Sequence, residues 1–307
     1  MDVLGAGAHR VTPTHGALRA LADEFGCASG DAGAEPDRDW ELYGAVDPQM
    51  HARLGALMGP SVPSAASWCL RMGGTFSLNG AGLRAAGPAL AWLADGAADR
   101  AAAAALNRCA AALDSLPAVV HVFPACHHSF IVDIMGGKMG MALGGCTVVL
   151  YMHPSITRHP NGLQQAVAEL VAHEYHHHAR LGYLVPWEAS VVTLADSLVL
   201  EGLAERFRLE TVGGTPAPWS VAVGEVDVED GLRRLPPVFA SISEEDSFLC
   251  MVGDQERIPH WLGYSLGFHL VGSAMRRLGR TAAELTTTPS RDILSAADPE
   301  WRAALGL

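Results

Sequence analysis

The sequence lacks several features that point to common classes of partner. It has no run of Lys or Arg beyond scattered Arg-Arg pairs, and its formal net charge is -12, so nucleic acid and anionic membranes are poor partners. Its first residues lack the basic start and apolar segment of a signal peptide, and no apolar run approaches the length of a membrane span. We therefore expect a cytoplasmic protein that binds neither nucleic acid nor membrane.

The sequence also lacks a CxxC pair. Its 6 cysteines are spread singly, which fits reduced and buried thiols better than a disulfide framework or a zinc site made of cysteines. Apolar residues, in contrast, make up 49% of the 307 residues and suffice for a substantial core. We expect one large globular domain or two closely packed ones, and the sequence leaves the oligomeric state open.

The first third of the chain carries no recognisable chemistry. Residues 1–115 are rich in Ala and Gly, and helical segments are predicted at 17–25 and 88–116. We expect this part to form a mainly helical N-terminal region that packs on the core.

Strand-forming sequence begins after this region. Short β-branched and aromatic runs predict strands at 118–123, 129–135 and 146–152. The segment 136–145 has too many glycines for a central strand. It is either an edge strand or hairpin lying close to a ligand, or a plain flexible hairpin.

From residue 161 onward the apolar residues recur at helical spacing. Asn161 is a suitable N-cap for a first helix, and a second is predicted to begin near Pro186 and to end at the glycines 213–214. A third apolar helix covers 260–279, and short helices finish the chain. The sequence thus predicts an α+β protein that is mostly helical, with a small mixed or antiparallel sheet.

The stretch VAHEYHHHARLG, residues 171–182, contains the motif HExxH. Its members are His173, Glu174 and His177. On a helix, histidines four positions apart share a face about one turn apart, so both can bind one tetrahedral zinc while the glutamate points at the open position. The apolar stripe of this helix continues directly into Glu174 and His177, where polar groups are costly to bury unless they are paired or bind a metal.

The neighbouring histidines point elsewhere. His176 is turned about 100° from His177 around the helix axis, and His178 by a similar angle the other way, so neither easily joins the same metal. The extended metzincin pattern is excluded, because Arg180 and Tyr183 stand where it requires glycine and histidine.

A zinc ion held by two histidines needs a third protein ligand and keeps a fourth position for water. Glu201 lies 24 positions after His177 on a helix that could return antiparallel to the first, and Gly202 beside it would allow close helix approach. Glu205, one turn further, could accept the second ring N–H of a ligand histidine. A solvated carboxylate face is the alternative for both glutamates.

Three segments, AHEYHH, DSLVLEGLAERF and GYSLGFHLV in that order, resemble the YjaZ-like predicted zinc-dependent protease family, a gluzincin group with HExxH plus a downstream glutamate. The resemblance covers about residues 115–280. It implies a zincin-like catalytic domain over 116–307, with a sheet edge beside the active-site helix where an extended peptide could lie. It also implies one zinc ion per chain, held by His173, His177 and Glu201, with Glu174 as the general base.

The gluzincin plan uses a tyrosine or histidine from a later helix to stabilise the oxyanion. The resemblance implies Tyr264 first and His269 second, and an ordinary amphipathic tyrosine is the alternative. The predicted function is a zinc metallohydrolase, foremost a metallopeptidase that cleaves a peptide or peptide-like amide with a zinc-activated water.

Two other functions stay open. The same scaffold could serve a specialised non-proteolytic reaction on a small biosynthetic metabolite, or the protein could be a non-catalytic zinc-binding regulator. The intact Glu174 argues against the regulator, because a purely structural zinc has no use for a general base.

Overall fold

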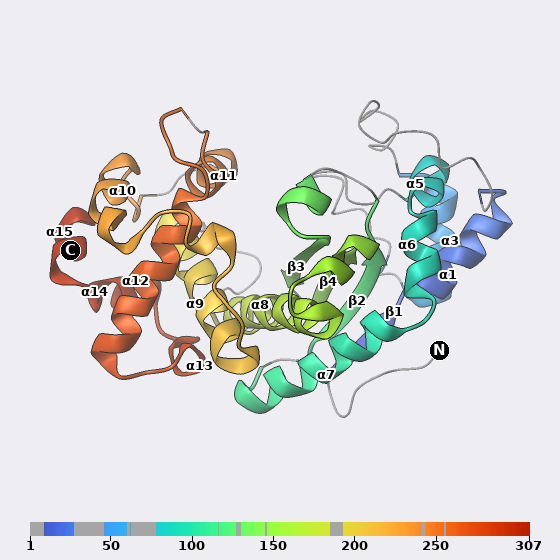
Figure 1. Ribbon diagram of the computed structural model, residues 1–307, viewed down its shortest axis with the longest axis horizontal. Helices are drawn as coiled ribbons and strands as arrows, with labels where there is room; N and C mark the ends of the chain where they lie inside the picture. The colour runs from blue at the N-terminus through green and yellow to red at the C-terminus, as the bar shows by residue number, and fades with distance from the viewer. Residues whose placement is uncertain are drawn as a thin grey trace. The chain divides into compact units, whose positions relative to one another are not determined.

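The computed structural model describes residues 9–27, 46–59, 62, 78–115, 117–126, 130–144, 146–184, 193–240, 243–254 and 256–307. The chain divides into two compact units (Figure 1). The first comprises described residues within 1–110 and 116–174, and the second those within 111–115 and 175–307.

A four-stranded mixed sheet forms the centre of the first unit. Its strands are β1 Arg10–Pro13, β2 Val119–Pro124, β3 Lys138–Gly144 and β4 Thr147–Met152, in the order β1-β2-β4-β3. Strands β1, β2 and β4 run parallel, whereas β3 pairs antiparallel with β4 at the edge. Strands β2 and β4 are buried along almost their whole length, which explains their near-continuous apolar sequences.

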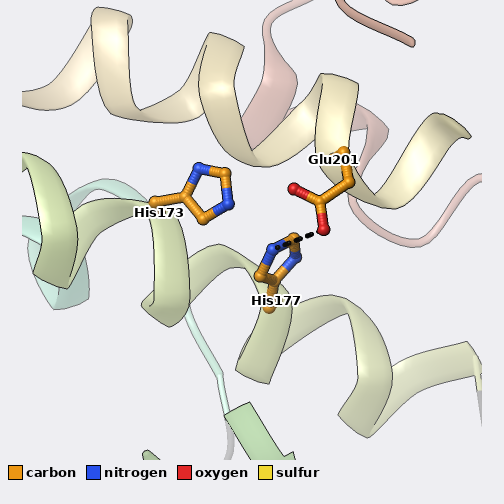
Figure 2. Close-up of side chains that lie close together, drawn as sticks. All are labelled: His173, His177 and Glu201. Atoms are coloured by element: carbon orange, nitrogen blue, oxygen red, sulfur yellow. Dashed lines mark ion pairs between the residues drawn. The ribbon is translucent and has the colours of Figure 1, made fainter. Parts of the chain in front are cut away.

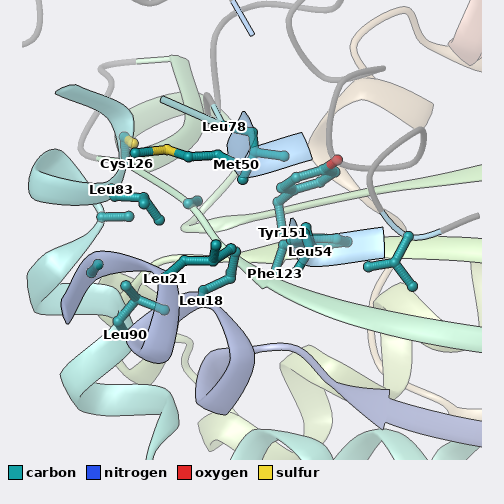
Figure 3. Packing of buried hydrophobic residues seen from close by; sticks show 14 of the residues in the cluster. Leu18, Leu21, Met50, Leu54, Leu78, Leu83, Leu90, Phe123, Cys126 and Tyr151 are labelled. Carbon is teal, nitrogen blue, oxygen red and sulfur yellow. The ribbon is translucent and has the colours of Figure 1, made fainter. Parts of the chain in front are cut away.

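Helices from the N-terminal part pack on one face of this sheet. They are α1 His15–Glu24, α3 Pro48–Met58, α5 Gly80–Ala85 and α6 Gly87–Leu93, and α7 Ala97–Ala112 follows them along the chain. Apolar side chains of α1, α3, α5 and α6 form one cluster with Phe123 of β2 and Tyr151 of β4 (Figure 3). The rings of these two aromatic residues stack with their centroids 5.5 Å apart.

Helix α8, Gly162–Leu184, carries the histidine-rich stretch and contributes to both units, which divide after Glu174. Between Ala166 and Arg180 every side chain is buried except those of Glu169 and His173, which are partly exposed. Because this part of the helix is buried on all sides, its polar side chains need partners within the protein.

The second unit is helical. Its main helices are α9 Leu194–Val212, α10 Val228–Arg234, α11 Glu244–Val252 and α12 Leu262–Leu278, and it ends with α13 Ala282–Leu285, α14 Ser290–Ser295 and α15 Pro299–Ala304. Helix α9 starts at a capping box formed by Thr193 and Asp196 and stops at Gly213, whose φ is 74°. Helices α9 and α12 pack closely at Gly202 and Gly267, where an added Cβ on either would touch the backbone of the other helix.

The structure confirms an α+β protein that is mostly helical with a small mixed sheet. The strand predicted at 129–135 is wrong, because Phe130–Ile134 forms one turn of π-helix with two exposed residues at its end. The helix predicted at 88–116 is interrupted, because Gly96, with a φ of 68°, ends the turn after α6. No helix among the described residues is both long and apolar enough to span a membrane.

The second long helix begins at Leu194, after the extended N-cap Thr193, and not near Pro186 as predicted; Pro186 itself lies outside the described residues. The division into an N-terminal region over 1–115 and a catalytic domain over 116–307 stays a prediction.

Candidate metal centre

Two histidines and a glutamate from two helices come together in the structure. His173 and His177 are one turn apart on α8, and Glu201 is on α9, with the three side chains directed toward one another (Figure 2). Each residue offers one ligand atom, and these atoms all lie within 4.8 Å of one another. Within the described part of the chain, no other group of three or more His, Cys, Asp or Glu residues meets in this way.

The ligand atoms fit a small tetrahedral cation. Nε2 of His177 lies 3.5 Å from Oε1 of Glu201. With zinc–ligand bonds of about 2.0–2.1 Å, two ligand atoms of a tetrahedral site are roughly 3.3 Å apart. Two imidazole nitrogens and one carboxylate oxygen also match the donors of catalytic zinc sites. His173 and Glu201 are partly exposed, so the group is not sealed from solvent.

The first turn of α9, the helix that carries Glu201, is linked to α8 by hydrogen bonds. The side chain of Asp196 closes the capping box with Thr193 and also accepts a hydrogen bond from Ser290 Oγ at 2.6 Å. The same hydroxyl accepts a hydrogen bond from Nη2 of Arg180 at 3.0 Å. A chain of hydrogen bonds therefore runs from α8 through Ser290 to the start of α9.

Arg180 has two more partners in the C-terminal segment. It is 2% exposed and donates to the carbonyl oxygens of Thr286 at 2.9 Å and Thr288 at 3.1 Å. Burial lowers the pKa of this guanidinium to about 10. In the sequence, Arg180 only excluded the metzincin pattern. Its hydrogen bonds to the C-terminal segment could not be predicted, because the partners lie more than 100 positions further along the chain.

Glu174 lies against the edge strand. Its side chain is buried, and a Cβ placed on Gly140 of β3 would be 2.8 Å from both Cδ and Oε1 of Glu174. The backbone of β3 therefore passes directly beside this carboxylate. The glycine-rich segment 136–145 contains this strand, which is at an edge of the described sheet and pairs antiparallel with β4. A ligand close to this segment stays a prediction.

The neighbouring histidines have partners outside the ligand group. Nε2 of the buried His176 lies 3.2 Å from Oγ1 of Thr286, and its ring is 5.4 Å from that of Phe207. The buried ring of His178 is 6.4 Å from the ring of Tyr175. Neither histidine belongs to the group of converging ligand atoms, which confirms the directions predicted from the helix geometry.

Glu205 and Gly202 have neighbours that the sequence did not indicate. The buried carboxylate of Glu205 accepts hydrogen bonds from Nε and Nη2 of Arg208 at 3.1 and 2.5 Å and from the backbone N–H of Ala217 at 2.6 Å. Its predicted hydrogen bond to a ligand histidine stays a prediction. Gly202 does allow close helix approach, and the helix that it meets is α12.

Tyr264 and His269 are both on α12. Tyr264 is partly exposed and contacts Trp261 edge to face, with ring centroids 5.4 Å apart. Nε2 of His269 lies 3.0 Å from the carbonyl oxygen of Val223, so this nitrogen donates its hydrogen there, and burial lowers the pKa of the imidazole. A neutral imidazole with this N–H engaged is a poor oxyanion donor, which favours Tyr264. Both roles stay predictions.

Fold and site together define a class: a helical α+β protein with a candidate His-His-Glu metal centre beside a buried glutamate. A family model described as "Predicted Zn-dependent protease (DUF2268)" matches residues 98–295, and the chain belongs to this family. The predicted resemblance to the YjaZ-like family is thereby confirmed. The match includes the three candidate ligands and Glu174, whereas most of the N-terminal third lies outside it.

Two relatives come from Bacillus subtilis (strain 168). Uncharacterized protein YjfC is 30% identical over 139 residues, which is 42% of this chain and 46% of YjfC. Uncharacterized protein YjaZ is 29% identical over 133 residues, which is 43% of this chain and 51% of YjaZ. The chain thus spans about half the length of the curated relatives it matches. No solved structure matches it significantly.

Proposed function

We propose that the protein is a zinc metallohydrolase, and more narrowly a metallopeptidase of the gluzincin type with one zinc ion per chain. His173, His177 and Glu201 would hold the metal. The observation that carries this proposal is the convergence of their ligand atoms within 4.8 Å, next to the buried Glu174. The family description, a predicted Zn-dependent protease, supports the same class. The HExxH helix and the mixed sheet with its antiparallel edge strand support a zincin-like fold.

The chemistry would be divided among residues of this site. A bound zinc would supply a Lewis acid that polarises an amide carbonyl and acidifies water at the fourth position. Glu174 would accept a proton from the attacking water and deliver it to the leaving amine. Tyr264 is the proposed donor to the developing oxyanion, with His269 the second candidate.

Strand β3 supports a peptide as the substrate. It is one of the two edge strands of the described sheet, and its backbone passes beside Glu174. An edge strand presents N–H and C=O groups to which an extended chain can add by backbone hydrogen bonds. A peptide paired with β3 would have an amide bond within reach of the proposed base.

Incubation of the zinc-loaded protein with a peptide library and a panel of small amides, followed by mass spectrometry, tests this function. We expect cleavage of peptides, and we expect Glu174→Gln to abolish it while keeping about one zinc per chain, because Glu174 is not a ligand. Glu300→Gln, at an exposed glutamate of α15, is the matched control and should retain activity.

The same experiment separates the alternatives. Turnover of one small amide and of no peptide would indicate the specialised non-proteolytic reaction. Stable zinc binding without turnover of any compound would indicate the regulatory protein. Full activity of Glu174→Gln would contradict the proposed role of the base.

A further inference from the structure

One face of strand β3 lies on helix α8. Alternate residues of a strand point to opposite faces, and Met139 packs in the apolar cluster, so Lys138 and Gly140 point the other way. Nζ of Lys138 donates to the carbonyl oxygen of Ala166 at 3.1 Å and to Oε2 of Glu169 at 2.9 Å, and both partners are on α8. The strand is thus anchored to the helix through a charged side chain.

This anchor is shielded from water. The side chains of Lys138 and Glu169 are 11% and 13% exposed. Oε2 of Glu169 is also 3.2 Å from Nε2 of His159, and Oε1 accepts a hydrogen bond from Gln165 at 3.2 Å. Shielded ion pairs are screened by salt much less than surface pairs. The anchor holds β3 against α8 one turn before His173, the first candidate ligand.

Two residues further along the same face, Gly140 meets Glu174. A Cβ at position 140 would lie 2.8 Å from Cδ and from Oε1 of Glu174, and closer still to its Cγ. The backbone of Gly140 is not in the left-handed region, so its φ does not require glycine. Position 140 needs a residue without a side chain, because the side chain of Glu174 occupies the space that a Cβ would fill.

We propose that Gly140 is a positioning residue for Glu174. Because it has no side chain, the carboxylate can lie against the strand backbone, and the Lys138 anchor prevents the strand from withdrawing to make room for a larger residue. The inference deepens the proposed function, since it treats Glu174 as the general base. It adds that the edge strand sets where this base stands.

Kinetics of Gly140→Ala test the positioning. A displaced base should lower kcat about 100-fold, the loss that a misplacement of about 1 Å produces, while the zinc content stays unchanged. Gly16→Ala, where an added Cβ meets nothing within 4 Å, is the control and should leave kcat unchanged. A wild-type kcat in Gly140→Ala, or a zinc content that falls together with kcat, would overturn the proposal.

Unfolding by urea tests the same contact without relying on activity. Gly→Ala at an unstrained backbone position ordinarily stabilises a protein. We expect Gly140→Ala to lower the urea midpoint when Glu174 is present and to leave it unchanged or raise it in a Glu174→Ala background, where the obstacle is gone. A midpoint lowered equally in both backgrounds would overturn the inference. If Gly140→Ala lowers the urea midpoint only when Glu174 is present but the protein turns over no substrate, the proposed function is wrong and the contact between Gly140 and Glu174 is still supported.

Discussion

Replacing Gly202 by alanine would show how closely α9 must pack for Glu201 to reach its place. Gly202 is buried and directly follows Glu201, and an added Cβ would lie 2.6 Å from the carbonyl carbon of Gly267 and closer still to its oxygen. The obstacle is the backbone of α12, which cannot rotate aside. Non-bonded carbon atoms rest about 3.5–4.0 Å apart, so the two helices would have to separate by about 1 Å.

Two opposing effects set the change in stability. Overpacking a buried site costs about 1–3 kcal/mol, whereas alanine favours a helix over glycine by about 1 kcal/mol. We expect the free energy of unfolding to fall by up to about 2 kcal/mol, and Tm to fall by roughly 2–4 °C for each kcal/mol. A ligand displaced by about 1 Å exceeds the tolerance of about 0.2 Å on metal–ligand distances, so zinc affinity should fall at least about 10-fold.

Calorimetry and competition with a chromophoric chelator measure these two effects. Gly267→Ala should behave like Gly202→Ala, because its Cβ would lie 3.0 Å from the carbonyl carbon of Leu198 on α9. Gly16→Ala, at an unobstructed position of α1, should leave zinc affinity unchanged and should not lower Tm. If Gly202→Ala kept the wild-type Tm and zinc affinity, the reasoning that links the α9–α12 contact to the position of Glu201 would be refuted.

Two other predictions concern buried charges. Arg180→Met leaves the carbonyl oxygens of Thr286 and Thr288 without this donor and should lower the free energy of unfolding by about 1–3 kcal/mol for each carbonyl, with Arg180→Lys recovering only part. A total loss below about 1 kcal/mol in urea unfolding would contradict this. Burial raises the pKa of the Asp99 carboxyl from 3.8 to about 6. Ionisation of this carboxyl therefore destabilises the folded state by about 3 kcal/mol. The whole penalty applies above about pH 6, and none of it applies below pH 3.8. Asp99→Asn should therefore stabilise the protein at pH 7.5 and not at pH 3.5, and equal effects at both pH values would show that the carboxyl does not titrate as described.

The ligand pair on α8 could be predicted because it depends on local geometry alone. Four positions on a helix bring His173 and His177 to one face whatever surrounds them. The prediction of Glu201 as a ligand also needed a second helix, whose end the glycines 213–214 indicate. The structure places the Glu201 carboxylate 3.5 Å from His177. The direction of His176 also followed from the helix period.

The structural features that the sequence did not predict depend on contacts between residues far apart in the chain. The pairing of β1 with β2 joins positions 109 apart, and no local pattern at Arg10–Pro13 indicates it. The β-branched residues at 129–135 favoured a strand, yet strand propensity reflects packing against neighbours, and Phe130–Ile134 forms a helical turn instead. The glycine-rich segment left an edge strand and a plain flexible hairpin open, and only the three-dimensional structure shows that Gly140 faces Glu174.

The zinc content of the purified protein tests the central claim most directly. Mass spectrometry of the metal after dialysis against buffered zinc should give about one zinc per wild-type chain and almost none for His177→Ala, which loses a ligand imidazole. A wild-type protein that binds no zinc, or a His177→Ala variant that binds as much as the wild type, would contradict the metal centre formed by His173, His177 and Glu201.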